Sequence, residues 1–386
     1  MNTRNRSDEL IAYVFALLIY IPSNSWGNII RMGLLSVVFI FKYLRESHAR
    51  RDVTAIAGDM VISPLLSSVI VFLFEGVLGS SLFIHEMMRM IFSALMLLTV
   101  TKMNVSFKCI YRIALLALLP NLAIQLMQYL HIGDISSVIR AYYLTEDVTG
   151  WSHLDLASGT EIEFRSGSVF LNPNVYMVIP LMSLVVFLQQ DRLKPKLVNY
   201  IFILCSVLSC LLTGSRTSTV ASVFIFGFYF LRYANKRSKI VIIAMMVLIA
   251  AEMGKSLSEE SRALQLFNFE DGNADSLIVK IKGFLWFWQS TLSIPVYWLT
   301  GALTSSIAVS IDCEWGHIYT WYGIFGLYWY IKYLKIAINQ NSSVSYYAKP
   351  LTYVSGIIAI TASVLLCMPI YSFVAVLLFA NLSENC

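Results

Sequence analysis

The sequence predicts an all-α integral membrane protein, and three observations support this. Hydrophobic residues fill 58% of the 386 positions, against about 45–50% in an ordinary soluble domain. The apolar residues come in repeated blocks of about 17–22 residues, the length of a helix that crosses a bilayer. The blocks do not alternate between polar and apolar positions, so we expect a bundle of helices rather than a closed barrel of strands.

Twelve apolar blocks run through the chain, and we expect them to form one polytopic membrane domain over residues 1–386. They lie near residues 9–23, 27–44, 53–74, 82–101, 109–130, 168–189, 197–213, 216–232, 239–254, 315–333, 351–366 and 368–381. The stretch GFLWFWQSTLSIPVYWL at 283–299 is a further candidate. Its Gln289 and Pro295, with tryptophans spread along it, favour a segment on the outer membrane surface or one that re-enters the membrane.

The basic residues predict how the bundle is oriented. Eighteen of the 28 lysines and arginines lie in loops of one face, which include KYLRESHARRD and RYANKRSK, and only seven lie on the opposite face. Cytoplasmic loops carry such an excess, so we expect the richer face and both chain termini in the cytoplasm. The basic residues sit in short loops between the blocks, which argues against a nucleic-acid partner.

Two loops on the predicted periplasmic face, 131–167 and 255–314, are far longer than the others. Loops of this length are usually functional. The first combines aromatic rings, carboxylates and two arginines, a mixture that suits a carbohydrate surface, although an ordinary solvated loop fits the composition equally well. The six cysteines are scattered, and their spacing suggests neither a disulfide framework nor a metal site.

The stretch LLTGSRTSTV at 211–220 places Arg216 in the break between two apolar blocks. Its neighbours are small, so the backbone can approach a ligand closely. The next helix is expected to begin here, where free N–H groups favour an anion, and an arginine adds a planar fork suited to phosphate. We therefore expect a phosphate site at headgroup depth; an arginine that snorkels to ordinary headgroups is the alternative.

Two asparagines mark the start of another apolar block, in RSGSVFLNPNVYMVIP at 165–180. Asn172 can cap a helix whose first turn contains Pro173. Asn174 then faces the outer loops, where both amides could orient a sugar or a phosphate. Plain helix capping explains Asn172 equally well.

A third stretch, IDCEWGHIYTWYGIFGLYWYI at 311–331, supplies candidates for a general base. Asp312 and Glu314 precede a predicted span, and His317 lies about one turn further in. Any of the three could accept a proton from an incoming hydroxyl. Helix capping explains the two acids equally well, and a packed polar contact explains the histidine.

Charged residues also occur inside the apolar blocks, where they are costly. Glu86 and Arg89 are three residues apart within the block at 82–101. Such residues share one face of a helix, so we expect the two side chains to form an ion pair.

The order of these motifs resembles the O-antigen polymerase and O-antigen ligase superfamily over roughly residues 160–331. An arginine precedes an N-P-N helix start, an S-R pair lies between two tightly joined blocks, and a D-x-E motif opens a late block with the spaced glycines Y-G-I-F-G. The layout of twelve blocks agrees with the superfamily over the whole chain.

The resemblance implies a bacterial inner-membrane glycosyltransferase that needs no metal or other cofactor. Members of the superfamily act at the periplasmic face on undecaprenyl-diphosphate-linked sugars. Ligases of the superfamily rely on a histidine in the large late periplasmic loop. Here the loop 255–314 has no histidine, because His317 already belongs to the next block, and this favours a polymerase of oligosaccharide repeat units.

Roles for individual residues also follow from the resemblance. Arg216 is implied to contact the diphosphate, with Asn172 and Asn174 lining the site. The loop arginines implied to hold the donor diphosphate or the growing chain are Arg140, Arg165 and Arg262. The expected partners are the undecaprenyl-diphosphate-linked oligosaccharide, the lipid bilayer and a chain-length regulator protein.

Two rival functions stay open at this point. One is an O-antigen ligase that transfers finished polysaccharide to lipid A-core. The other is a transporter or flippase of the lipid-linked oligosaccharide, which would be expected to hold its polar residues in a central cavity at mid-membrane. The candidate residues instead cluster in the two outer loops and at their junctions, and this favours chemistry at the surface.

Overall fold

The computed structural model describes most of the chain. The described ranges are 3–22, 24–45, 50–76, 79–133, 135–143, 167–170, 173–193, 196–232, 239–240, 243–244, 247, 275–307, 313–340, 345–359 and 367–382. The ninth predicted block, at 239–254, and most of the first long loop therefore lie largely outside the described residues.

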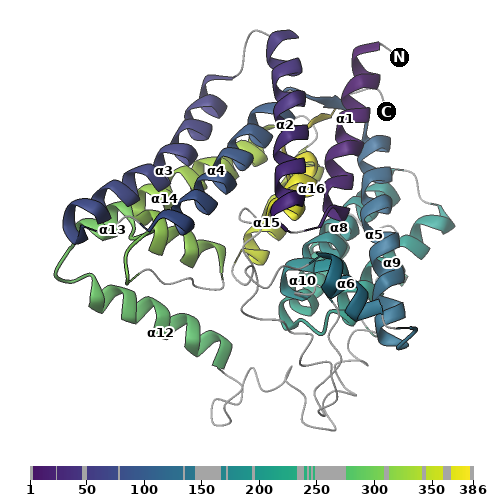
Figure 1. The fold of residues 1–386 in the computed structure, drawn as a ribbon. Helices are drawn as coiled ribbons and strands as arrows, with labels where there is room; N and C mark the ends of the chain where they lie inside the picture. Colours follow the sequence, from purple (N-terminus) through teal and green to yellow (C-terminus); the bar gives the residue numbers. More distant parts are fainter. Residues whose placement is uncertain are drawn as a thin grey trace.

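Helices account for nearly all of the regular structure (Figure 1). They are α1 (Thr3–Leu17), η1 (Leu18–Tyr20), α2 (Ser25–Arg45), α3 (Arg51–Glu75), α4 (Ser80–Val100), α5 (Phe107–Tyr129), α6 (Ile135–Tyr143), η3 (Ser168–Phe170), α7 (Pro173–Tyr176), α8 (Val178–Leu193), α9 (Leu197–Leu212), α10 (Arg216–Arg232), α12 (Asp275–Ser290), α13 (Val296–Thr300), α14 (Glu314–Gln340), α15 (Ser345–Ile358) and α16 (Met368–Phe379). The only strands among the described residues are β1 (Asn104–Val105) and β2 (Asn381–Leu382). The expected all-α class is confirmed.

Four described helices are long and apolar enough to cross a membrane, by length and composition. They contain Ser25–Tyr43, Arg51–Glu75, Ser81–Val100 and Phe107–Tyr129, and shorter apolar helices cover Val178–Asp191, Leu197–Leu212, Thr217–Tyr229 and Met368–Phe379. These helices coincide with predicted blocks and indicate a protein embedded in a membrane. The total of twelve spans and the side on which each loop lies stay predictions.

Helix α16 is the most buried element of the bundle. All twelve of its residues are buried, and it packs against α1, α4, α14 and α15. Helices α3, α4, α13 and α14 lie on one side of it, and α5, α8, α9 and α10 lie on the other (Figure 1). The hydrophobic core is therefore continuous through the middle of the molecule.

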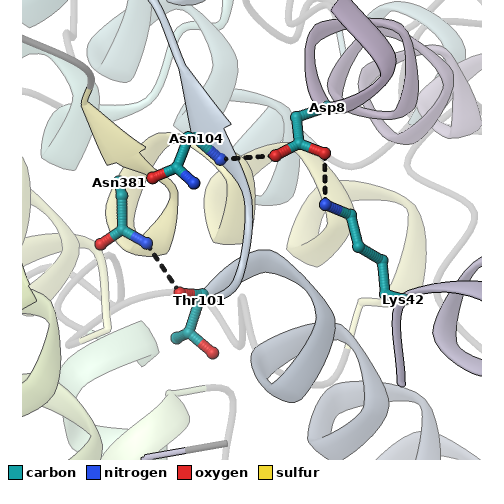
Figure 2. A network of polar contacts seen from close by, with 5 residues as sticks. All are labelled: Asp8, Lys42, Thr101, Asn104 and Asn381. Atoms are coloured by element: carbon teal, nitrogen blue, oxygen red, sulfur yellow. Dashed lines mark hydrogen bonds and ion pairs between the residues drawn. The ribbon is translucent and has the colours of Figure 1, made fainter. Parts of the chain in front are cut away.

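A buried polar network joins both ends of the chain at one end of the bundle (Figure 2). Lys42 pairs with Asp8, and both side chains are almost fully buried. The other oxygen of Asp8 accepts the backbone N–H of Asn104 at 2.9 Å. Asn104 pairs in parallel with Asn381, whose side-chain amide donates to the Thr101 carbonyl at 2.8 Å. We call these five residues the terminal clamp; it places both described ends of the chain at the same end of the bundle.

The second long loop contains two helices, α12 and α13. Phe287 of α12 is buried against Tyr319 of α14, with the two rings 5.8 Å apart. Leu285, Trp286 and Trp288 stay exposed. The stretch 283–299 is not one continuous helix, because α12 ends before Pro295 and α13 begins after it. This break is compatible with the expectation that the stretch 283–299 lies on the membrane surface or re-enters the membrane without spanning it.

Candidate functional site

Helix α14 reverses its direction at Gly323. The backbone there has φ 62° and ψ −156°, which is outside the helical region. The rings of Trp315 and Tyr330 are 4.7 Å apart, and a Cβ on Gly326 would lie 3.0 Å from the Ile318 carbonyl oxygen. In a straight helix, residues 8 or 15 positions apart are too distant for such contacts. The two halves of α14 must therefore run antiparallel to each other. The predicted span over 315–333 is therefore not one continuous straight helix, and its crossing of a membrane stays a prediction. We call Glu314–Tyr322 the folded-back segment.

Two glycines allow this reversal because two backbones cross there. A Cβ on Gly323 would lie 2.4 Å from the Leu299 carbonyl, and a Cβ on Gly301 would lie 2.1 Å from the Trp321 carbonyl. Gly301 also has a positive φ, 75° with ψ −177°, a combination that is essentially restricted to glycine. The Ala302 N–H donates to the Thr320 carbonyl at 3.0 Å between the two chain segments. A side chain at either glycine would therefore clash with the backbone of the other segment.

The segment after α12 is anchored on the last turns of α3. The Tyr297 hydroxyl donates to Glu75 at 2.9 Å, and the Leu303 N–H donates to the Ser67 hydroxyl at 3.0 Å. Burial raises the pKa of Tyr297, and the bond to the Glu75 carboxylate raises it further. Tyr297 is therefore a neutral donor, and the bond holds α13 against α3.

The reversal carries Glu314 into the interior of the bundle. Only 3% of this residue is exposed, and its backbone N–H donates to the Ala359 carbonyl at 2.8 Å. The buried Tyr330 side chain interacts electrostatically with its carboxylate. The ring of Tyr333 lies 5.9 Å from that of Tyr330 and 6.4 Å from that of Tyr371. Glu314 is therefore packed among other side chains of the bundle and is not exposed on its surface.

His317 lies one turn after Glu314 on the folded-back segment. It is 4% exposed, and its ring centroid is 3.7 Å from that of Trp321. Its backbone N–H donates to the Cys313 carbonyl at 2.9 Å. The side-chain Nε2 has no hydrogen-bond partner among the described residues. A buried polar atom without a partner is costly, so such atoms are often reserved for a ligand or a reaction.

The expected ion pair between Glu86 and Arg89 is confirmed. Arg89 Nη1 donates to Glu86 Oε1, and the Tyr322 hydroxyl donates to Glu86 Oε2 at 2.7 Å. The glutamate is fully buried, whereas 32% of the arginine side chain is exposed. Tyr322 belongs to the folded-back segment, so the pair is linked to the helix that carries His317.

A fully buried arginine, Arg31, is a further charged residue inside the bundle that was not predicted as a site residue. Arg31 of α2 is fully buried and donates to the carbonyls of Leu18 and Ile21 and to the Asn28 side chain. Arg31 and Arg89 both act electrostatically on Cys367, the residue before α16. The sequence could have identified Arg31 by its charge inside an apolar block, which is as costly there as the charge of Arg89.

Arg216 is the first residue of α10, as the sequence predicted. Gly214 before it has φ 55°, and Thr213 and Ser215 are buried with a 3.2 Å hydrogen bond between them. The turn is therefore tight and built from small residues. The side chain of Arg216 itself lies outside the described structure.

The other predicted site residues are described only in part. Arg140 belongs to α6 and Asn174 to α7, which begins at Pro173 as expected, but their side chains are not described. Four further residues lie wholly outside the described ranges, namely Asp312, Arg165, Asn172 and Arg262.

Among the described candidates, the fold brings Glu314 and His317 together but keeps the helix of Arg216 apart. Helix α10 packs against α8, α9 and α15, whereas α14 packs mainly against α3, α13 and α15. Figure 1 shows the two helices in different parts of the bundle, with α15 between them. The cation linked to the folded-back segment is instead Arg89, whose partner Glu86 also accepts the Tyr322 hydroxyl.

Within the described ranges, no three histidine, cysteine, aspartate or glutamate side chains come together as a metal site would require. A comparison of the chain with models of known protein families found no match, and a search of curated proteins found none either.

Proposed function

We propose that the protein is a glycosyltransferase that polymerises undecaprenyl-diphosphate-linked oligosaccharide repeat units into O-antigen or a related surface polysaccharide. The reaction is proposed at the periplasmic face of a bacterial inner membrane. The observation that carries the proposal is the buried imidazole of His317, whose Nε2 has no partner among the described residues. The resemblance of the motifs to polymerases supports the same conclusion.

The proposed reaction needs a proton acceptor and a cation. A hydroxyl of the incoming repeat unit attacks the anomeric carbon of the donor glycan, and its proton passes to Nε2 of His317. The bond from that carbon to the diphosphate breaks, and the diphosphate leaves with the electron pair. A well-placed donor that stabilises such growing negative charge lowers a barrier by about 3–4 kcal/mol.

His317 suits the role of base better than the neighbouring carboxylate does. The Glu314 carboxylate already interacts with Tyr330, whereas Nε2 of His317 is unpaired among the described residues. In this proposal Arg216 contacts the diphosphate and the asparagines Asn172 and Asn174 line the site. The loop arginines Arg140, Arg165 and Arg262 hold the donor, and a chain-length regulator is a further partner.

Transport of the lipid-linked unit is a second candidate, and one observation favours it. Glu86, Arg89 and Glu314 lie inside the bundle rather than in the outer loops, and the helix that carries Glu314 is broken at Gly323. Transporters build their binding sites from broken helices and buried polar residues in this way.

The surface polysaccharide of a deletion strain distinguishes these functions. Loss of a polymerase leaves lipid A-core capped with single repeat units. Bare core with polymer retained on its lipid carrier identifies a ligase and overturns the proposal. Bare core with single lipid-linked units confined to the cytoplasmic leaflet identifies a transporter and overturns it as well.

A further inference from the structure

Arg89 lies far from either end of an apolar helix. It is nine residues after the start of α4, a distance of about 13 Å along the axis. A charged residue at the centre of a membrane helix costs about 2.5–3.5 kcal/mol on insertion scales. An ion pair alone does not repay this cost, because replacing a buried pair by apolar residues is often neutral or stabilising. The arginine therefore calls for a role beyond packing.

The surroundings of Arg89 fix its orientation along one edge. Glu86 is fully buried and accepts from Arg89 Nη1 with one oxygen. Its other oxygen accepts the Tyr322 hydroxyl at 2.7 Å. Each carboxylate oxygen thus accepts one hydrogen bond, one from α4 and one from the folded-back segment, and Glu86 holds the guanidinium without enclosing it.

Most of the donors of Arg89 are available to a ligand. A guanidinium carries five N–H groups, and the bond to Glu86 is the one hydrogen bond that Arg89 forms within the described part of the chain. About a third of the side chain is exposed. This is the arrangement of an arginine that is positioned in advance to bind an oxyanion through its planar fork.

His317 provides a second, independent indication of a ligand. It is nine-tenths buried, Nε2 has no described partner, and it lies on the same folded-back segment as Tyr322, whose hydroxyl bonds to the carboxylate that holds Arg89. A neutral imidazole nitrogen beside a guanidinium can accept a hydrogen bond from a hydroxyl. A ligand that satisfies both groups therefore carries an oxyanion and, next to it, a hydroxyl.

A second cation acts on the same region as Arg89. Arg31, like Arg89, acts electrostatically on Cys367, which precedes α16, and the N-terminal end of that helix carries a partial positive charge. These charges would stabilise an anion near Arg89 without contacting it.

We propose that Arg89 and His317 form a binding site for a phosphorylated sugar, with the phosphate on Arg89 and a sugar hydroxyl on Nε2 of His317. Glu86 and Tyr322 are positioning residues that hold the guanidinium. The inference rests on the proposed function only for naming the incoming lipid-linked repeat unit as the physiological ligand, since the donor diphosphate is assigned there to Arg216. The same chemistry is offered by a soluble sugar phosphate and by a lipid-linked one.

Titration calorimetry of the full-length protein in phosphatidylcholine nanodiscs tests this site. The probes are inorganic phosphate, glucose 1-phosphate and glucose linked to farnesyl phosphate. We expect Arg89→Lys, which keeps a cation beside Glu86, to bind the sugar phosphates about tenfold or more weakly, because the fork is lost. Arg89→Gln should bind none of them. The matched control is Arg50→Gln, in an exposed pair with Asp52, and it should bind like the wild type.

His317→Phe separates the two halves of the site. It keeps a ring against Trp321 but removes the acceptor nitrogen, so any preference for glucose 1-phosphate over inorganic phosphate should disappear. Equal binding of both sugar probes identifies a soluble ligand, and binding of the farnesyl-linked probe alone identifies a lipid-linked one; both support the site.

Two results would overturn the inference. One is a wild-type protein that binds none of the three probes, and the other is an Arg89→Lys variant that binds them as well as the wild type does. A protein that still makes polymer under either result leaves the proposed function standing, so the two failures are distinguishable.

Discussion

At the scale of single residues, His317 is the group on which the proposed chemistry depends most directly. Its burial against Trp321 fixes the ring, and Nε2 is left without a described partner. Both properties arise from the folded-back segment, which places a polar residue in the bundle interior.

Replacing His317 with glutamine should remove the base and keep the fold. The amide cannot take up the proton of the acceptor, so we expect glycan extension by purified protein to slow by about 10²–10⁴-fold. The thermal unfolding temperature in detergent should change little, since glutamine also fits a polar buried position. Extension at nearly the wild-type rate would exclude His317 as the base.

Arg216 tests the second part of the mechanism. Arg216→Ala should abolish polymer while the protein still inserts into the membrane, because a neutral residue cannot offset the charge of a diphosphate. Arg216→Lys should retain little polymer, since the planar fork is lost. The measurement is the chain length of surface polysaccharide in a complemented deletion strain, and normal chains with the alanine variant would contradict the assigned role.

At the scale of elements, the crossing of Gly301 and Gly323 decides where the candidate residues lie. The reversal at Gly323 turns one apparent span into two antiparallel halves. Without it, Tyr322 would not reach Glu86 and Trp315 would not reach Tyr330.

Gly323→Ala should therefore destabilise the protein strongly. Its φ and ψ cost a residue with a side chain about 1–3 kcal/mol, and the added Cβ would meet the Leu299 backbone. The control is Gly33→Ala, where a Cβ would meet no atom within 4 Å and φ is helical. It should be neutral or stabilising by about 0.5–1 kcal/mol. Unfolding in a dodecyl sulfate titration measures both, and equal stabilities for the two variants would disprove the crossing.

Apolar block length predicted most helices well, because span length is set by the bilayer and not by distant contacts. The ends of α3, α4 and α9 fall within a few residues of the predicted blocks. The reversal at Gly323 could not be predicted, since the apolar pattern continues across it. It becomes necessary only through contact with the backbone of Leu299, far earlier in the chain, and such long-range contacts leave no local pattern.

The candidate site could be predicted from the sequence only in part, because it too depends on long-range contacts. The sequence identified Glu314 and His317 by residue type and expected the ion pair of Glu86 and Arg89. It did not indicate that Tyr322 joins these two groups, because their proximity depends on how α4 packs against the folded-back segment.

At the scale of the whole molecule, the terminal clamp joins the first helix, the turn after α4 and the last strand. Its ion pair is almost fully buried, so each partner depends on the other for its stability in the interior.

Asp8→Asn should leave the Lys42 charge buried and unpaired. Breaking such a pair costs about 3–5 kcal/mol in the free energy of unfolding. The matched change Asp52→Asn affects an exposed pair with Arg50 and should cost about 0–1 kcal/mol. Similar losses in the two variants, measured in the same dodecyl sulfate titration, would show that the clamp does not hold the ends of the bundle together.

The most direct measurement of the central claim is reconstitution of the purified protein into vesicles with purified undecaprenyl-diphosphate-linked repeat units. A polymerase produces longer glycans and releases free undecaprenyl diphosphate in equal amount to the new linkages. Movement of the units across the bilayer without any extension would contradict the account and identify a transporter.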